Sequence, residues 1–326
     1  MTAAPARVSV IIATYNRAAM LDECLTHLQS QRFIAGDEVI VVDNGSTDAT
    51  AEVVARHQRW WTTPLRLLRE PRPGKSHAVA LALGAAAGDL LAFTDDDVNV
   101  GPAWLEAIRA ALLDPDIAIA GGPVAARWDS AVPQWFRAAV AGEARLGAPI
   151  ALLDYGAQRA DLGERTLLGA NLAVRRDVFT AAGGFPTHLG KLRGTLLSGE
   201  DHELCRRVQA EGHRAVYVPD AVVHHWVPAQ RARVGYYLNW FFWSGITHAI
   251  MDGPAPAGRA VAGLPFYLLR RAASGSAGVV AALLSARPTL ALTRAIDVAF
   301  AAGYAAQRWG RIARTAGAPQ PVGEPA

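Results

Sequence analysis

The first hundred residues alternate between short runs of β-branched residues and helical patterns, and this alternation restricts the fold more than any other feature. Residues 8–13 and 38–42 have the composition of strands that are buried on both faces of a parallel sheet. Between these runs, Leu21, Leu25 and Leu28 recur at helical spacing. Strands that alternate with helices in this way predict an α/β domain with a largely parallel sheet.

The same patterns predict the other elements of the chain. We expect further strands at residues 65–68, 90–94, 117–120, 166–174, 215–218 and 221–223. We expect helices at 49–57, 76–87, 104–113 and 200–211, and a helical, apolar region from Gly235 onward with breaks near Pro254, Pro265 and Pro288.

Polar residues follow three of the predicted strands at the point where each strand ends. They are Thr14-Tyr15-Asn16, Asp43-Asn44 and Asp95-Asp96-Asp97. Because α/β sheets bind ligands beyond the carboxyl ends of their parallel strands, we expect these three segments to meet at one crevice.

The aspartate run is the centre of the candidate site. Three consecutive carboxylates repel one another unless a cation neutralises them, and hard divalent ions prefer oxygen ligands. The run therefore indicates either a metal site or a solvated acidic turn. A calcium loop that starts at Asp95 would need glycine at its sixth position, where Val100 stands, and a helix where a strand is predicted. We reject the calcium loop.

Three other features bear on the same site. Asp201 lies in the first turn of a predicted helix, where it either stabilises the helix dipole or acts as a general base. The pair His224-His225 is either packed or solvated, or it completes a carboxylate metal site. Lys75 follows Gly74, but Arg69 stands where a P-loop needs glycine, so Lys75 is at most a phosphate contact at a helix start.

Composition excludes several classes of protein. The net charge of +3 without a continuous basic run argues against a nucleic-acid partner. Cys24 and Cys205 both fall in helical patterns, and we expect two buried thiols. The start of the chain lacks the apolar core of a signal peptide, and Arg294 and Asp297 interrupt the most apolar segment. We expect a cytoplasmic protein, either free or peripheral at the inner face of the cell membrane.

Taken in order, nine segments of the chain resemble the family 2 glycosyltransferases, which are inverting enzymes with the GT-A fold. The segments are VSVIIATYNR, EVIVVDNGSTD, PGKSHA, GDLLAFTDDDV, GGPV, LLGANLAVRRDVF, GGF, GED and VPDAVVHH, from Val8 to His225. The resemblance implies an α/β GT-A fold with a Rossmann-like, mostly parallel sheet. It implies a catalytic domain over 7–232, with a nucleotide-sugar half at about 7–100 and an acceptor half at about 101–232, before a helical extension over 233–326.

The resemblance also implies roles for the predicted site residues. Thr14, Tyr15 and Asn16 would lie near the nucleotide, Asp43 would contact the base edge, and Lys75 and Asp96 would belong to the same nucleotide-sugar site. Asp97 would be the main ligand of Mn²⁺ or Mg²⁺, Asp95 would face the ribose or the metal, and His225, which fits the pattern better than His224, would complete the metal site. Asp201 would be the base that takes the proton of the acceptor hydroxyl.

The implied reaction transfers one sugar from a nucleoside diphosphate donor to a hydroxyl acceptor, in the synthesis of a cell-surface polysaccharide, glycolipid or related glycoconjugate. Uridine is the base that the resemblance favours, while thymidine and guanosine stay open. Gln307-Arg308-Trp309 does not match the motif of the processive synthases. The alternatives are a nucleotidyltransferase, whose glycine-rich basic loop is missing after residue 13, and a non-catalytic nucleotide-sugar-binding protein.

Two further segments concern the acceptor and the membrane. The loop at 187–197 is expected to contact the acceptor, but it carries no readable code for it. Residues 236–243 are rich in aromatic side chains, which either pack in the core or meet a membrane surface or a lipid-linked acceptor. Residues 266–271, which end in two arginines, favour the second interpretation.

Overall fold

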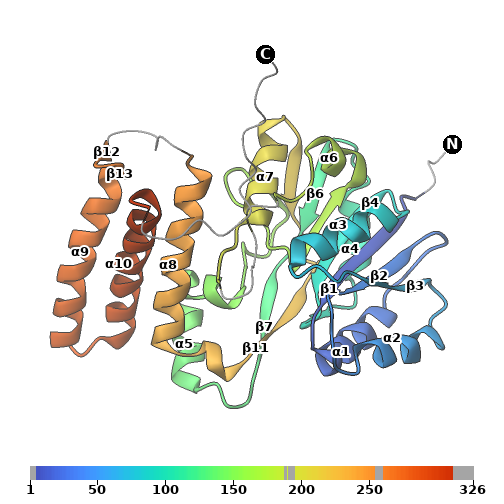
Figure 1. The fold of residues 1–326 in the computed structure, drawn as a ribbon, viewed down its shortest axis with the longest axis horizontal. Coiled ribbons are helices and arrows are strands. Elements are labelled where there is room, and N and C mark those ends of the chain that lie inside the picture. Colours follow the sequence, from blue (N-terminus) through green and yellow to red (C-terminus); the bar gives the residue numbers. More distant parts are fainter. Residues whose placement is uncertain (1–4, 187–188, 190–194, 254–259, 311–326) are drawn as a thin grey trace. The chain divides into compact units, whose positions relative to one another are not determined.

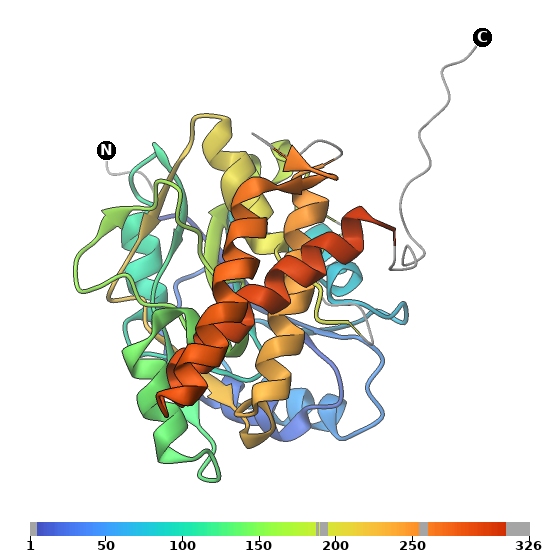
Figure 2. The ribbon, with the colours of Figure 1, turned by 90° about the vertical axis from the view of Figure 1, so that its left-hand side faces the viewer.

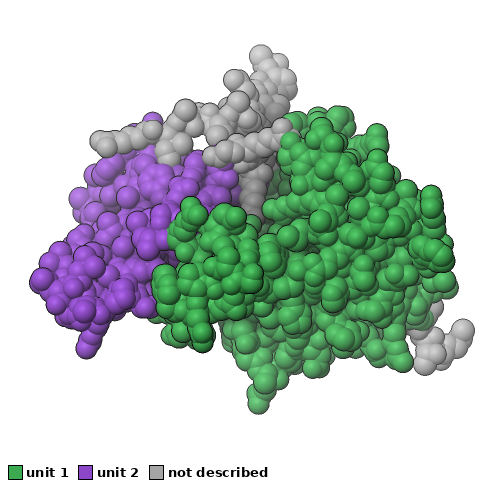
Figure 3. All heavy atoms as spheres, turned by 90° about the horizontal axis from the view of Figure 1, so that it is seen from below, with its two compact units in different colours: residues 1–186, 191–194, 200–233 green, residues 187–190, 195–199, 234–326 purple. Residues whose placement is uncertain are grey.

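The computed structural model describes residues 5–186, 189, 195–253 and 260–310 (Figure 1). The chain divides into two compact units, which are coloured separately in Figure 3. Unit 1 contains the described residues up to 186 together with 200–233, and unit 2 contains residue 189, residues 195–199 and the described residues from 234 onward.

Unit 1 is built around an eight-stranded sheet with the order β3-β2-β1-β4-β9-β6-β10-β8. Its strands are β1 (Val8–Thr14), β2 (Glu38–Asp43), β3 (Leu65–Arg69), β4 (Leu90–Asp95), β6 (Ile117–Gly121), β8 (Ala160–Asp161), β9 (Asn171–Arg175) and β10 (Arg214–Tyr217). The four strands β3, β2, β1 and β4 are parallel neighbours, as the sequence predicts. Strand β9 then runs antiparallel to both β4 and β6, so the sheet is mixed.

Helices cover both faces of this sheet (Figure 1). They are α1 (Ala18–Gln29), α2 (Thr50–Gln58), α3 (Lys75–Ala85), α4 (Trp104–Ala111), α6 (Arg176–Ala181) and α7 (Glu200–Ala210). Unit 1 also contains α5 (Gln134–Gly142), which is not part of these two layers. Successive side chains of a strand point to opposite faces. Accordingly Val10 and Ile12 pack with α1, α2 and α4 in one core cluster, whereas Ile11 packs with α3, α6 and α7 in the other.

Most predicted elements of unit 1 begin and end within two residues of the observed ones, but two predicted strands are wrong. The strand expected at 166–174 starts only at Asn171, because Leu167 is buried in the core without pairing to a strand. The strand expected at 221–223 is instead β11 (Val223–Val227), which contains both histidines. Polar residues inside β11 hide its pattern, since only every second side chain is buried.

Strand β11 belongs to a small second sheet that the sequence did not predict. It pairs antiparallel with β5 (Val98–Val100) and parallel with β7 (Val124–Trp128). The pairing sets His225 opposite Val98, immediately after the aspartate run. This small sheet therefore brings a late segment of the chain to the end of β4.

Unit 2 is helical, as predicted from Gly235 onward. It contains α8 (Val234–Met251), the short hairpin β12 (Ala260–Val261) and β13 (Leu264–Pro265), α9 (Phe266–Leu284) and α10 (Pro288–Arg308). Breaks occur at Pro265 and Pro288 as expected, while Pro254 lies outside the described residues. Helix α10 packs against both α8 and α9 (Figure 2). Where α8 and α10 meet, a Cβ on Gly303 would lie 1.8 Å from the Phe242 carbonyl oxygen, so the backbones touch.

None of the described helices combines the length and the hydrophobicity needed to cross a membrane. Cys24 and Cys205 are buried free thiols, as predicted. Of the aromatic side chains at 236–243, Tyr237 and Phe241 are buried and the other four are half-buried, which is consistent with the packing interpretation. The acceptor loop expected at 187–197 lies largely outside the described residues.

Candidate active site

The carboxyl ends of β2, β1 and β4 lie side by side at one edge of the sheet. Thr14 pairs with Asp43 of β2, and Ala13 pairs with Asp95 of β4. The predicted convergence of the three polar strand ends is therefore confirmed. It follows from the parallel register, because neighbouring parallel strands deliver their last residues to the same edge.

The residues after β1 and β2 connect the two loops to each other. Asn16, at φ 51°, accepts a 2.7 Å hydrogen bond from the Thr47 N–H through its Oδ1, and its own N–H donates to Ser46 Oγ at 2.9 Å. Asp43 is buried and accepts a 2.7 Å hydrogen bond from the Ser46 N–H. Tyr15, in contrast, is 43% exposed at the same edge. The polar residues thus hold the loops after β1 and β2 together, while the Tyr15 side chain is exposed to solvent beside them.

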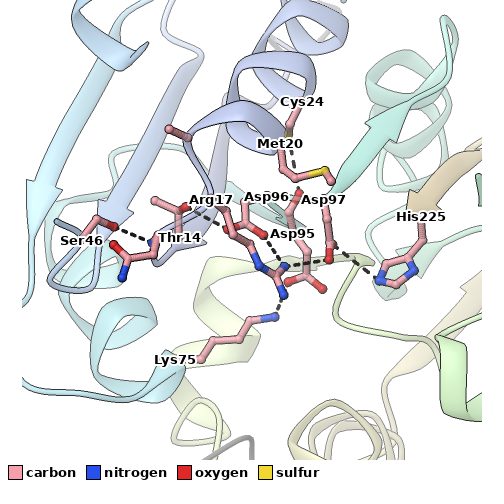
Figure 4. A network of polar contacts seen from close by, with 12 residues as sticks. Thr14, Arg17, Met20, Cys24, Ser46, Lys75, Asp95, Asp96, Asp97 and His225 are labelled. Atoms are coloured by element: carbon pink, nitrogen blue, oxygen red, sulfur yellow. Dashed lines mark hydrogen bonds and ion pairs between the residues drawn. The ribbon is translucent and has the colours of Figure 1, made fainter. Parts of the chain in front are cut away.

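Arg17 binds two of the three aspartates (Figure 4). Its Nη1 donates to Asp96 Oδ1 at 2.9 Å and to Asp97 Oδ2 at 2.7 Å. Asp96 also accepts a 2.8 Å hydrogen bond from the Thr14 hydroxyl through its other oxygen. Both carboxylates are buried, and one half-exposed guanidinium serves them together. Buried carboxylates need such partners, because an unpaired buried charge is costly.

The third aspartate has a different cation. Lys75, the first residue of α3, forms an ion pair and hydrogen bond with Asp95 (Figure 4). Burial alone would lower the pKa of Lys75, but the charges of Asp95 and Glu200 outweigh it and raise that pKa. Lys75 therefore carries its positive charge between the aspartate run and the start of α7.

Burial is the main cause of a raised pKa at the central residue of the run. Burial, together with the charges of Asp97 and Asp95, raises the pKa of Asp96 to about 6, although Arg17 and Thr14 act in the opposite direction.

Arg17 itself was not among the predicted site residues. A lone cation directly after a strand that ends in polar residues is a weak signal, and only the fold shows which carboxylates it reaches.

The structure brings His225, and not His224, to the aspartate run. His225 is buried, and its Nε2 lies 3.5 Å from Asp97 Oδ1 (Figure 4). His224, in contrast, lies on the exposed side of β11. The backbone holds this arrangement, since the Trp226 N–H donates to the Asp97 carbonyl oxygen at 2.9 Å. Within the described part of the chain, Asp97 Oδ1 is buried and accepts no hydrogen bond.

A half-buried salt bridge lies beside the same strands. Arg127 of β7 donates to both oxygens of Glu23 at 2.7 and 2.6 Å and lies 4.9 Å from the centre of the Trp226 ring. Glu23 Oε1 also accepts from Asn99 Nδ2 at 2.8 Å. These contacts tie α1 to β5, β7 and β11, and they support the position of His225. The sequence reasoning missed them, because they join residues that lie far apart in the chain.

The donor set suits a divalent cation only in part. Within residues 5–310, apart from the undescribed segments, no group of three or more histidine, cysteine or carboxylate side chains is arranged around a metal position. Asp95 is engaged by Lys75, and Asp97 Oδ2 by Arg17. Asp97 Oδ1 and His225 Nε2 face each other, and one oxygen and one nitrogen suit Mn²⁺ or Mg²⁺ when phosphate oxygens supply further ligands.

Asp201 lies at the start of α7, held by three donors. Its Oδ2 accepts from the Gly169 N–H at 2.8 Å, and its Oδ1 accepts from the His202 N–H at 2.8 Å and lies 3.0 Å from His202 Nδ1. Burial alone would raise the pKa of Asp201, but the hydrogen bonds from His202 and Gly169 outweigh it and lower that pKa. Asp201 is thus ionised at neutral pH.

A pocket connects Asp201 with the strand ends. It is lined by Ala13 and Thr94 near the ends of β1 and β4, and by Lys75, Gly169 and Asp201. Lys75 contributes to this pocket and also binds Asp95. Lys75 therefore links the aspartate run to the pocket that Asp201 lines.

Comparison with known proteins shows which protein family the chain belongs to. The model of glycosyl transferase family 2 matches residues 9–180, which is more than half of the chain. The chain belongs to glycosyltransferase family 2. It is therefore a glycosyltransferase, and family membership decides against the nucleotidyltransferase alternative. The resemblance noted in the sequence is confirmed at the level of the family.

Relatives within glycosyltransferase family 2 act on different glycoconjugates. The chain is 26% identical over 255 residues to glucosyl-dolichyl phosphate glucuronosyltransferase of Haloferax volcanii, covering 76% of this chain and 77% of the relative. It is 28% identical over 245 residues to the succinoglycan biosynthesis protein ExoM of Rhizobium meliloti, covering 74% of each chain.

A solved structure confirms the fold of this family member. The mannosyltransferase PcManGT of Pyrobaculum calidifontis, solved with GDP-Man and Mn²⁺, superposes with a TM-score of 0.61 at 24% identity. The match covers 95% of this chain and 89% of that one. At this identity it supports the GT-A-like fold with C-terminal helices, and nothing finer.

Proposed function

We propose that this family 2 glycosyltransferase moves a single sugar from a nucleoside diphosphate donor to a hydroxyl group, with inversion, to build a polysaccharide, glycolipid or related glycoconjugate. The relatives named above, a dolichyl phosphate glycosyltransferase and a succinoglycan biosynthesis protein, support the class of product. UDP is the first nucleotide to test, with TDP and GDP next. The pocket that Lys75 and Asp201 line together is the observation that carries the proposal.

The donor would bind across the ends of β1, β2 and β4. Tyr15, which is exposed at this edge of the sheet, is suited to contact the nucleotide base. Asp43, at the end of the neighbouring strand, is suited to bind the polar edge of the same base. Thr14 and Asn16 use their side chains to hold Asp96 and the second loop, so we assign them the task of shaping the site. Lys75 at the start of α3 is suited to a phosphate, since helix N-termini favour anions.

Asp97 and His225 would hold Mn²⁺ or Mg²⁺, with Asp95 as a further ligand or a ribose contact. The support is the buried Asp97 Oδ1, which faces His225 Nε2 at 3.5 Å and has no hydrogen bond among the described residues. A bound divalent cation would neutralise the charge that develops on the diphosphate as the glycosidic bond breaks. Arg17 and Lys75 hold the carboxylates in place around that position.

Asp201 would take the proton from the acceptor hydroxyl. The Gly169 N–H and His202 fix its carboxylate, and its lowered pKa keeps it ionised at neutral pH. An acceptor activated there would attack the anomeric carbon from the side opposite the diphosphate, which inverts that carbon. Only one carboxylate transfers a proton in this scheme, unlike the two that glycoside hydrolysis needs.

Asp201→Asn tests the proposal directly. The side chain keeps its size, but it can no longer accept a proton, so transfer should fall by about 10²–10⁴-fold. Binding of the donor with Mn²⁺, measured by calorimetry over a panel of UDP-, TDP- and GDP-sugars, should stay within about twofold of the wild type. Undiminished transfer would remove Asp201 as the base. Intact binding without transfer in the wild type would favour the non-catalytic alternative.

We also propose that residues 7–232 form the catalytic domain and that the extension at 233–326 contacts a membrane surface peripherally. The candidate surface is α9 and not the aromatic run of α8. Exposed apolar side chains occur along α9 at Phe266, Tyr267, Val280 and Leu284, and Arg270 is exposed among them. Such a face suits anionic lipid. Co-sedimentation with anionic vesicles should fall in a Val280→Glu/Leu284→Glu variant, and no wild-type binding would refute the contact.

A further inference from the structure

A second pocket opens at the edge of the sheet opposite the candidate active site. Helices α1 and α2 begin after the carboxyl ends of β1 and β2, and they run back along the sheet because they connect parallel strands. The segments that follow them, residues 29–33 and 60–63, therefore lie at the amino edge. They line a pocket with a volume of about 390 Å³, within the range of about 300–1,000 Å³ that is typical of ligand sites.

Aromatic rings form one part of this pocket. Trp60 is 75% exposed, although it is the largest apolar side chain a protein can expose. Behind it, the rings of Trp61 and Phe33 pack with their centres 6.0 Å apart, and His57 meets Trp61 edge to face at 6.4 Å. The pocket thus presents a broad aromatic surface on a packed support.

Polar groups form the other part. Gln29, Thr62 and Thr63 line the pocket, and none of these three side chains hydrogen-bonds to another described residue. Gln31 is buried and fixed, since it donates to the Gly101 carbonyl oxygen at 3.0 Å and accepts from the Leu105 N–H at 3.1 Å. An amide and two hydroxyls therefore remain to meet a ligand around the aromatic surface.

We propose that this pocket binds a short segment of a glycan chain, at a distance from the site of transfer. A pyranose ring has a face of C–H groups and a rim of hydroxyls, and so it matches aromatic surface bordered by amide and hydroxyl groups. Purely apolar ligands would leave these polar groups unpaired. A phosphate would find one cation, Arg32, which lies 3.5 Å from Glu106 and shares its charge with it.

A glycan site apart from the transfer site would act through effective concentration. An acceptor chain held at the amino edge of the sheet stays near the enzyme, so a weak second contact strengthens the binding of a long acceptor. This role rests on the proposed function, because it needs a glycan acceptor. The binding itself does not, since it involves neither donor, metal nor Asp201.

Binding is measured on the full chain without donor or metal. Saturation-transfer NMR and tryptophan fluorescence follow titration with maltotriose, cellotriose and chitotriose, and with the methyl glycosides of the corresponding monosaccharides. At least one trisaccharide should bind, and it should bind more tightly than the methyl glycoside of its monosaccharide unit. Trp60→Ala should weaken that binding about fivefold or more, and Gln29→Ala should weaken it less.

Trp135→Ala is the matched control, because Trp135 is also exposed, at 62%, and lies on α5 away from the pocket. It should leave trisaccharide binding unchanged, and thermal melting should show that both tryptophan variants are folded. No trisaccharide binding in the wild type, or equal binding in Trp60→Ala and the wild type, would overturn the proposal. Loss of transfer in Asp201→Asn with trisaccharide binding retained would separate the two sites.

Discussion

Arg17 donates a 2.7 Å hydrogen bond to Asp97 across 80 positions of the sequence, and so a cation from the loop after β1 is bound to the aspartate that follows β4. The same Nη1 also reaches Asp96 at 2.9 Å. Two buried carboxylates thus share one guanidinium at the place where the donor diphosphate is proposed to bind. The aspartate run is a largely buried cluster held by Arg17 and Lys75, and not a solvated acidic turn.

Removing this cation should change both stability and the response to metal. Arg17→Ala leaves Asp96 and Asp97 buried without their charged donor, which should lower the free energy of unfolding by about 1–3 kcal/mol. Because the cluster is then more negative, Mn²⁺ should raise the Tm more in Arg17→Ala than in the wild type. Arg66→Ala is the control, since the equally half-exposed Arg66 pairs with buried Glu38 at the first residue of β2, at the other edge of the sheet. Equal Mn²⁺ shifts in all three proteins would contradict the arrangement.

His224, the neighbour of His225 on β11, provides a control for the two proposed metal ligands, Asp97 and His225. Asp97→Asn and His225→Gln should each weaken Mn²⁺ binding in the presence of UDP by at least about tenfold, measured by electron paramagnetic resonance. His224→Gln should have no effect, because His224 lies on the exposed side of β11. A chelator should abolish transfer, and Mn²⁺ or Mg²⁺ should restore it. Full activity in chelator would rule out a catalytic metal.

The pair Asp201–His202 predicts a window of pH in which it stabilises the fold. The pKa of Asp201 is lowered, so its contribution is present above the ordinary value of about 4 and is lost as the pH falls through the folded pKa. Burial opposes the shift of His202, but Asp201 raises its pKa, so that contribution is full below about 6.5 and is lost as the pH rises. The pair is strongest between about pH 4 and 6.5.

His202→Gln isolates this effect. The difference in Tm between the wild type and His202→Gln should be larger at pH 5.5 than at pH 8.5. His213→Gln, a change at an exposed histidine after α7, should show no such difference. A Tm difference for His202→Gln that does not vary with pH would mean that the two side chains are not electrostatically coupled.

The close approach of α8 and α10 makes a glycine indispensable in unit 2. In Gly303→Ala the new Cβ would meet the Phe242 carbonyl oxygen at 1.8 Å, so the helices must separate, at a cost of about 1–3 kcal/mol or more. Gly235→Ala in α8 is the matched control, since no atom lies within 4 Å of its added Cβ. Denaturant unfolding should show the loss only for Gly303→Ala, and equal stability of both variants would contradict the packing.

The sequence by itself determined the elements and the edge of the sheet that carries the chemistry. Sequence patterns located β1, β2, β3 and β4 to within two residues, and β1 and β2 are the β-branched runs that are typical of buried parallel strands. Polar residues at three strand ends then predicted the crevice, since parallel strands end at the same edge. Local patterns are enough for such features, because strand period, helix period and turn residues depend on neighbours in the chain.

Only the tertiary structure decided which side chains meet. Nothing in the local pattern shows that Arg17 reaches Asp97, or that β11 carries His225 to the same aspartate from a late part of the chain. The antiparallel β9 and the small sheet of β5, β7 and β11 were likewise invisible, because a strand's partners and direction depend on long-range pairing. The local sequence determines the residue types of the site and the ends of the strands. The partner of each charged side chain depends instead on packing between segments far apart in the sequence.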